Sequence, residues 1–179
     1  MHTEVHVHGT VVLRSGVTQT EIEQALRPWF DYVDLDGLAD ARSAHPDEPG
    51  ATFDRRRRSL EICWTGYVGR NFQNALEAAF QSLSPYSEEA AALEVSYYHE
   101  DGQDEHGWVF VGPTAEAILE MQRRQMAEDV AALFARHFGD AEIGEAVALV
   151  NQLFARRGAD PQDRMQSRTA RVAGKKHLH

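Results

Sequence analysis

The sequence predicts an α+β fold: a four-stranded, mainly antiparallel sheet with helices on one face, in the order β-α-β-α-β-β, followed by a C-terminal αα-hairpin. Four segments alternate apolar and polar residues, as half-buried strands do. Other segments repeat apolar residues at helical spacing. The sequence shows no internal repeat and no linker. We therefore expect one α+β domain over residues 1–160, with a helical hairpin at 113–158, and a basic, disordered tail at 161–179.

The first strand and helix come from the N-terminal third of the chain. Residues 4–14 alternate in character over their whole length and predict a strand. Thr18 and Glu21 stand at capping-box spacing and begin a helix that ends near Phe30. Residues 34–58 then read as a long polar connection, rich in Asp, Pro and Gly, and loops of this length in a domain are usually mobile or functional.

The next elements complete the predicted sheet. A strand over residues 59–68 leads to a helix that starts near Asn71 and closes at Ser84-Pro85. Residues 92–99 and 106–111 alternate again, and the turn-rich segment between them predicts a β-hairpin.

Two amphipathic helices are expected at the end of the chain. The first begins at Pro113 and continues to about Phe138, where Gly139-Asp140 interrupts it. The second runs to about Arg157. This αα-hairpin either covers the second face of the sheet or projects and pairs with another chain.

Composition indicates the cellular compartment and the kind of genome from which the chain is expected to come. The single Cys63 cannot form an internal disulfide, and the strand-like start does not resemble a signal peptide, so we expect a reducing cytoplasm. No apolar run approaches the ~20 residues that cross a bilayer, so no membrane association is expected. The only two lysines lie in the tail and every other basic residue is arginine, which indicates a GC-rich bacterial or phage genome.

The charge distribution bears on partners. The chain has a formal charge of −10, but five of its 18 basic residues follow Asp163, so residues 1–163 carry −15. An acidic body repels nucleic acid, and contact with phosphate is expected only through the tail or local clusters.

Four histidines are candidate metal ligands. His6 and His8 lie on the same face of the first strand, where alternate side chains project in parallel about 6.5 Å apart. His99 and His106 flank the predicted hairpin turn and offer further ligands. A solvated strand face beside a charged turn accounts for the same residues without a metal.

Two features could bind anions. A glycine-bearing turn between a strand and a helix can present backbone N–H groups to an anion, although tight-turn geometry explains the same residues: Gly66, Gly69, Arg70 and Asn71. A compact positive run could grip phosphates or an acidic partner, or could neutralise Asp31, Asp34, Asp47 or Glu48 within the chain: Arg55, Arg56, Arg57 and Arg58.

The sheet face opposite the helices is expected to mix aromatic and small polar residues. Such a face can bind a ligand or pack against a partner. Its members are Cys63, Thr65, Tyr67, Ser96 and Tyr98, with Trp108 or Phe110. Cys63 as a nucleophile is disfavoured, because nothing in the sequence places a base beside it.

Residues 32–40 resemble the first motif of the haloacid-dehalogenase phosphatases, with Asp34 and Asp36 as the acid pair. The threonine of that motif is missing and no lysine precedes Lys175, so we exclude this activity.

No recognised catalytic or nucleotide-binding motif is present, and no cofactor is expected. We therefore expect a non-enzymatic accessory or interaction protein that acts as a homodimer, with a further protein partner left open. One alternative is a small-ligand or metal-dependent enzyme that uses the polar sheet face. Another is an acidic mimic of nucleic acid that occupies a basic partner.

Overall fold

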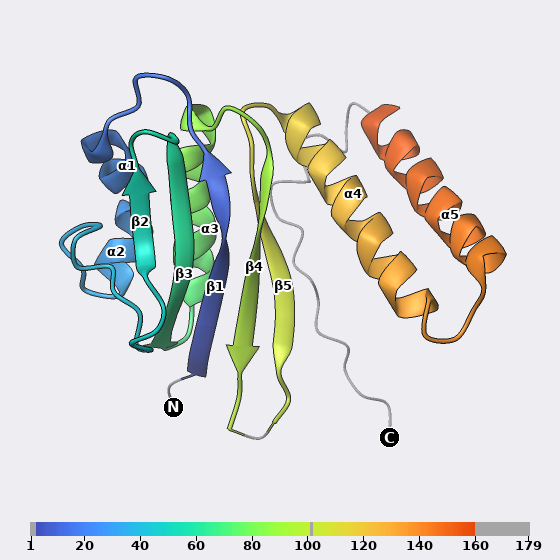
Figure 1. Ribbon diagram of the computed structural model, residues 1–179, viewed down its shortest axis with the longest axis horizontal. Coiled ribbons are helices and arrows are strands. Elements are labelled where there is room, and N and C mark those ends of the chain that lie inside the picture. The colour runs from blue at the N-terminus through green and yellow to red at the C-terminus, as the bar shows by residue number, and fades with distance from the viewer. Residues whose placement is uncertain (1–2, 101, 160–179) are drawn as a thin grey trace. The chain divides into compact units, whose positions relative to one another are not determined.

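A computed structural model describes residues 3–100 and 102–159 of the chain (Figure 1). The chain divides into two compact units, one ending at Gln122 and the other beginning at Arg123. The first unit contains a sheet with helices, and the second contains most of a helix pair. The expectation of a single domain over residues 1–160 stays a prediction, and the predicted disordered tail lies outside the described residues.

The sheet has five strands in the order β2-β3-β1-β4-β5, and all neighbouring strands are antiparallel (Figure 1). The α+β class is thus confirmed. The two longest strands, β1 and β3, are neighbours in the interior of the sheet. The bounds of the five strands are β1 Thr3–Val12, β2 Gly50–Asp54, β3 Ser59–Val68, β4 Ala91–Tyr98 and β5 Glu105–Val111.

The connections follow the split βαβ, or ferredoxin-like, arrangement. Helices connect β1 to β2 and β3 to β4, and in each case an antiparallel strand lies between the two strands that the helices join. Strand β5 extends this pattern through a hairpin with β4. Because this arrangement hosts many unrelated functions, the function has to be argued from the residues on its surfaces.

The prediction of four strands was wrong by one. Strand β2 lies inside the segment 34–58, which was expected to be a loop throughout. It is a short edge strand with only Ala51 and Phe53 directed at the core, and such a pattern is too brief to separate from a polar loop.

The first predicted helix is also divided into two. Helix α1 spans Gln19–Ala25 and helix α2 spans Arg27–Tyr32, with Leu26 as the cap between them. Pro28 lies in the first turn of α2, where its missing N–H does no harm, whereas inside a continuous helix its ring would clash with the preceding turn. The capping box at Thr18 and Glu21 is confirmed.

Helices α1, α2 and α3 (Phe72–Leu83) cover one face of the sheet (Figure 1). The short 3₁₀ helix η1 (Ser84–Tyr86) follows α3. The core between helices and sheet is strongly aromatic: the rings of Trp29 and Trp64 meet edge to face at 5.3 Å, and Trp29 also contacts Phe80. This packing leaves the second face of the sheet to the polar residues of the alternating pattern.

The helix pair at the end of the chain is confirmed, with bounds slightly different from those expected. Helix α4 spans Ala115–Phe134 and helix α5 spans Asp140–Ala159. In the second unit they run antiparallel, and Arg123 of α4 donates a hydrogen bond to Asn151 of α5 at 2.5 Å. Within the part of the chain that the structure describes, no helix has the length and apolar character that a membrane span requires.

Candidate functional site

A row of polar side chains crosses the sheet face opposite helices α1–α3. The strand register places His6 between Thr65 of β3 and Ser96 of β4, and Ser96 opposite His106 of β5. His6 Nδ1 lies 2.9 Å from the Thr65 hydroxyl, and His106 Nδ1 lies 2.8 Å from the Ser96 hydroxyl. These bonds fix both imidazole rings on the face.

The flanking rows contain the aromatic side chains expected there. Tyr67, Tyr98 and Trp108 are 63%, 41% and 37% exposed, respectively. Glu4 lies opposite both tyrosines in the register, and its hydrogen bond raises the pKa of the Tyr67 hydroxyl. The predicted mixture of aromatic and small polar residues is therefore present on one surface.

Residues 41–49, here called the covering segment, lie along strand β3 beyond the end of β2. Ala44 N donates to the Thr65 carbonyl at 2.8 Å, and Thr65 N donates to the Ser43 hydroxyl at 2.9 Å. Ser43 also donates to Glu48 Oε2. The covering segment buries Thr65 and brings Glu48 to the polar face.

His6, Glu48 and Cys63 form a cluster at this point. Their potential ligand atoms all lie within 4.8 Å of one another. His6 Nδ1 is 3.4 Å from Glu48 Oε1, and the two side chains are 24% and 21% exposed. Sequence periodicity predicts the shared face of His6 and Cys63, but nothing in the sequence places Glu48 beside them, because it arrives on an irregular segment.

The surroundings of the cluster shift the pKa values of Glu48 and Cys63 in opposite directions. Partial burial raises the pKa of Glu48, but hydrogen bonds from Ser43 and Thr65 and the charges of His6 and His45 together lower it by more. The pKa of this carboxyl is therefore below its usual value, and it is ionised at neutral pH.

Cys63 behaves in the opposite way. Burial first, and the charge of Glu48 second, raise the pKa of its thiol. An isolated thiol with this environment is a poor nucleophile, because attack requires the thiolate. This environment therefore disfavours covalent catalysis by Cys63.

The other predicted histidine ligands lie elsewhere on the face. His8 stacks on His6 with ring centroids 6.1 Å apart and stands opposite Cys63 in the register. His99 lies at the β4–β5 turn, where its backbone N–H donates to the Asp104 carboxylate. His106 packs edge-on against Tyr98. The structure thus brings His6 and His8 together, and places His99 and His106 toward the hairpin end.

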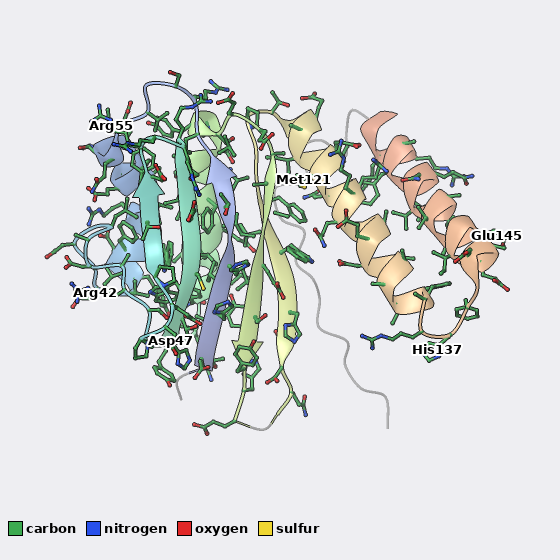
Figure 2. All side chains as sticks on the ribbon, in the orientation of Figure 1. Arg42, Asp47, Arg55, Met121, His137 and Glu145 are labelled. Carbon is green, nitrogen blue, oxygen red and sulfur yellow. The ribbon has the colours of Figure 1, made fainter. Side chains whose placement is uncertain are left out.

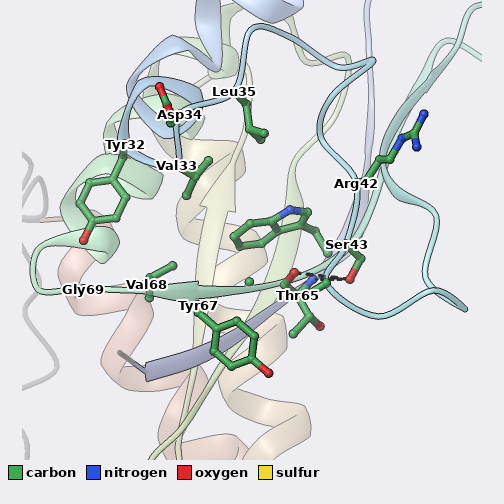
Figure 3. A pocket seen from close by; sticks show the side chains of 13 residues that line it. Tyr32, Val33, Asp34, Leu35, Arg42, Ser43, Thr65, Tyr67, Val68 and Gly69 are labelled. Atoms are coloured by element: carbon green, nitrogen blue, oxygen red, sulfur yellow. Dashed lines mark hydrogen bonds between the residues drawn. The ribbon is translucent and has the colours of Figure 1, made fainter. Parts of the chain in front are cut away.

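A cavity of about 520 Å³ has Ser43 and Thr65 in its lining, and Figure 3 shows its lining side chains. Tyr32, Val33 and Leu35 line it from the end of α2 and the turn that follows. Ser43 and Thr65 line it from the covering segment and β3, and the same two side chains contact Glu48 and His6. The volume is in the range of small-molecule sites.

The predicted anion-binding turn is occupied by internal contacts. A side chain at Gly66 would place its Cβ 2.3 Å from the Trp64 ring, so packing alone requires glycine here. Tyr32 donates to the Arg70 carbonyl at 2.7 Å, and a Cβ at Gly69 would lie 3.3 Å from the same hydroxyl. Asn71 caps α3 in a left-handed conformation.

The arginine run forms the turn between β2 and β3, and Arg55 lies at the opposite end of the sheet from Asp47 (Figure 2). Asp54 accepts the backbone N–H groups of Arg56 and Arg57. Arg58 forms an ion pair with Glu88 at 2.7 Å. The counter-charges of this run are thus its neighbours in the fold, and not the acids of the covering segment.

The helix pair exposes large apolar side chains. Met126 and Leu133 on α4, and Leu149 and Leu153 on α5, are each about half exposed, with fractions between 47% and 58%. Phe138 in the turn after α4 is exposed to a similar degree. In the described part of the second unit, Val150 is the one apolar residue that reaches full burial.

Comparison with known proteins gives a family but no activity. No curated protein and no solved structure is significantly similar to this chain. The model of a family of unknown function, DUF6806, matches residues 3–155, which include all five strands and most of the helix pair. The chain therefore belongs to the family of unknown function DUF6806.

Proposed function

We propose that this protein is a non-enzymatic interaction protein of the cytoplasm that acts as a homodimer, and that the dimer forms through helices α4 and α5. The observation that carries this proposal is the exposed apolar surface on both helices of the pair. Scattered exposed leucines are ordinary, but here they recur at helical spacing on two packed helices.

Two helices alone cannot form a core. The inner seam of the pair contains the half-buried residues Val130, Phe134 and Phe154, together with the buried Val150. Each helix faces a single neighbour along this seam, so its remaining apolar residues stay in water. Isolated helical hairpins are marginal for this reason, and bundles gain stability when a second pair buries these residues.

The exposed residues form one stripe on each helix. Met126 and Leu133 are two turns apart on α4, and Leu149 and Leu153 are one turn apart on α5. When each helix is viewed from its N-terminus, the exposed stripe is rotated away from the inner seam in the same direction on both helices. Because the helices are antiparallel, both stripes emerge on the same side of the pair.

A second copy of the chain is the partner that fits this surface. A two-fold axis brings the same patch of both subunits into contact, and an apolar stripe is complementary to itself. Pairing two hairpins in this way produces a four-helix bundle in which all four stripes become core.

Light scattering coupled to size exclusion tests the proposal at protein concentrations of tens of micromolar. We expect twice the chain mass of 20.1 kDa for the native protein. Leu133→Glu and Leu153→Glu should give monomers, because each buries a charge at the interface. Ala132→Glu and Ala155→Glu are the matched controls: these exposed positions lie on the same helices but outside the two stripes, and they should leave the dimer intact.

Two results would contradict the proposal. A native protein that elutes only at 20.1 kDa excludes the homodimer at this concentration. A dimer that survives both leucine substitutions, with helix content unchanged by circular dichroism, excludes these stripes as its interface.

A further inference from the structure

We infer that His6, Glu48 and Cys63 form a binding site for a divalent transition-metal ion of the zinc class, which fastens the covering segment to the polar face of the sheet. The three residues come from three different segments, β1, the covering segment and β3, and their ligand atoms converge within 4.8 Å. The site is independent of the helix pair and of any dimer that the pair forms.

The ligand set selects the metal. A thiolate, an imidazole and a carboxylate together suit zinc and its neighbours in the first transition row, whereas magnesium and calcium prefer oxygen ligands alone. Three protein ligands leave the fourth position of a tetrahedral ion open, as in zinc sites that bind water or a substrate atom.

The spacing is close to that of a loaded site. Ligand atoms around tetrahedral zinc lie roughly 3.3–3.7 Å apart, given bond lengths of about 2.0–2.3 Å. The His6 and Glu48 atoms are already 3.4 Å apart. Closure of the whole cluster from its limit of 4.8 Å requires a shift of about 1 Å, which side-chain rotation supplies.

A neighbouring hydroxyl holds Glu48 in place. Ser43 donates to Glu48 Oε2, which leaves Oε1 toward His6. Metal ligands in proteins are commonly fixed by outer hydrogen bonds of this kind. The Thr65 hydroxyl lies 2.9 Å from the same His6 Nδ1 that faces Glu48, so it gives up this contact when Nδ1 binds the ion.

Charge balance favours a dication. An ionised Glu48 and a deprotonated Cys63 supply two negative charges, which neutralise one divalent ion in a half-buried position. A bound divalent ion stabilises both anions together.

Cobalt spectroscopy tests the site directly, because Cys63 is the only cysteine of the chain. Addition of one equivalent of Co²⁺ to the untagged, reduced protein should produce the near-ultraviolet charge-transfer absorption of a cobalt–thiolate bond. Any such band reports this site alone, whichever other histidines bind cobalt. The absence of the band at micromolar protein would overturn the inference.

Variants identify the ligands. Cys63→Ser should abolish the thiolate band, and His6→Asn and Glu48→Gln should each weaken Co²⁺ affinity at least tenfold. His106→Asn is the matched control, since this imidazole lies on the same sheet face but two strands from β1, and it should leave the affinity unchanged. A band that persists undiminished in both His6→Asn and Glu48→Gln would overturn the assignment.

A measurement on the native chain covers the case in which a variant fails to fold. Saturating Zn²⁺ should slow the alkylation of Cys63 by iodoacetamide at least tenfold, because the metal occupies the thiolate. Equal alkylation rates with and without Zn²⁺ would contradict the site.

Discussion

Two tyrosine hydroxyls in the first unit have opposite hydrogen-bonding situations. The Tyr97 hydroxyl is buried and has no hydrogen-bond partner among the described residues, whereas the Tyr32 hydroxyl donates to the Arg70 carbonyl at 2.7 Å. A buried polar group without a partner loses its hydrogen bonds to water and forms none within the protein. We expect Tyr97→Phe to raise the free energy of unfolding by about 1 kcal/mol and Tyr32→Phe to lower it by a similar amount.

Urea unfolding measures the free energy of unfolding of both variants, and the pH dependence of that free energy gives a second test. Burial first, then the charges of Glu77 and Glu105, raise the pKa of Tyr97 to about 12 from 10.0. The folded protein therefore loses stability as the pH rises from 10.0 through about 12, because the unfolded chain releases this proton earlier. Tyr97→Phe should lose less stability over that range, and a Tyr97→Phe protein less stable than the native one at neutral pH would contradict the argument.

At the same scale, the candidate metal site shows which residues a sequence can place. Strand alternation puts His6, His8 and Cys63 on one face, since side chains on a strand repeat every second residue. It cannot place Glu48, which reaches the face through backbone contacts of the covering segment with Thr65. Nor can it show that His106 stands two strands from β1, because strand order is a long-range property.

At the scale of elements, Gly50 fixes the path of the covering segment into β2. Its φ is +81°, and a Cβ there would lie 2.0 Å from the Ala41 carbonyl oxygen, which accepts the Ala51 N–H. We expect Gly50→Ala to destabilise the protein by about 3 kcal/mol, from left-handed strain together with the clash.

Gly16→Ala separates the two causes. Gly16 has a φ of +88° with no atom within 4 Å of an added Cβ, so its substitution should cost only the strain, roughly 1–2 kcal/mol. The free energies of unfolding in urea compare the two variants. Equal losses for Gly16→Ala and Gly50→Ala would show that the Ala41 contact is not a constraint.

The elements differ in how far the sequence determines them. Strands β1 and β3 are long and alternate cleanly, and α3 presents a full apolar stripe, so all three were predicted close to their observed bounds. Strand β2 offers only Ala51 and Phe53 to the core and is held by its pairing with β3, which a local pattern does not contain. The break between α1 and α2 follows from Pro28, a signal that was present in the sequence but outweighed by the helical spacing around it.

At the scale of the whole molecule, the division into two units carries no sequence signal. Helix α4 runs through the boundary at Gln122, so no Gly- or Pro-rich linker marks it. The helix pair itself was predictable from its spacing, and so was the charge asymmetry between the acidic body and the basic tail.

Net charge makes a last prediction about assembly. Each chain carries a formal charge of −10, so two copies repel one another at low ionic strength. Raising the salt from about 50 mM to about 300 mM shortens the Debye length and screens that repulsion, while the apolar stripes on α4 and α5 keep their driving force. The dissociation constant of the homodimer should therefore fall several-fold, as measured by sedimentation velocity, with Leu133→Glu monomeric at both salt concentrations.

Contacts between basic residues and a polyanion have the opposite dependence, because salt weakens them steeply. A dissociation constant that rises with salt would thus point to an interface held by opposite charges and would contradict assembly through the apolar helix pair.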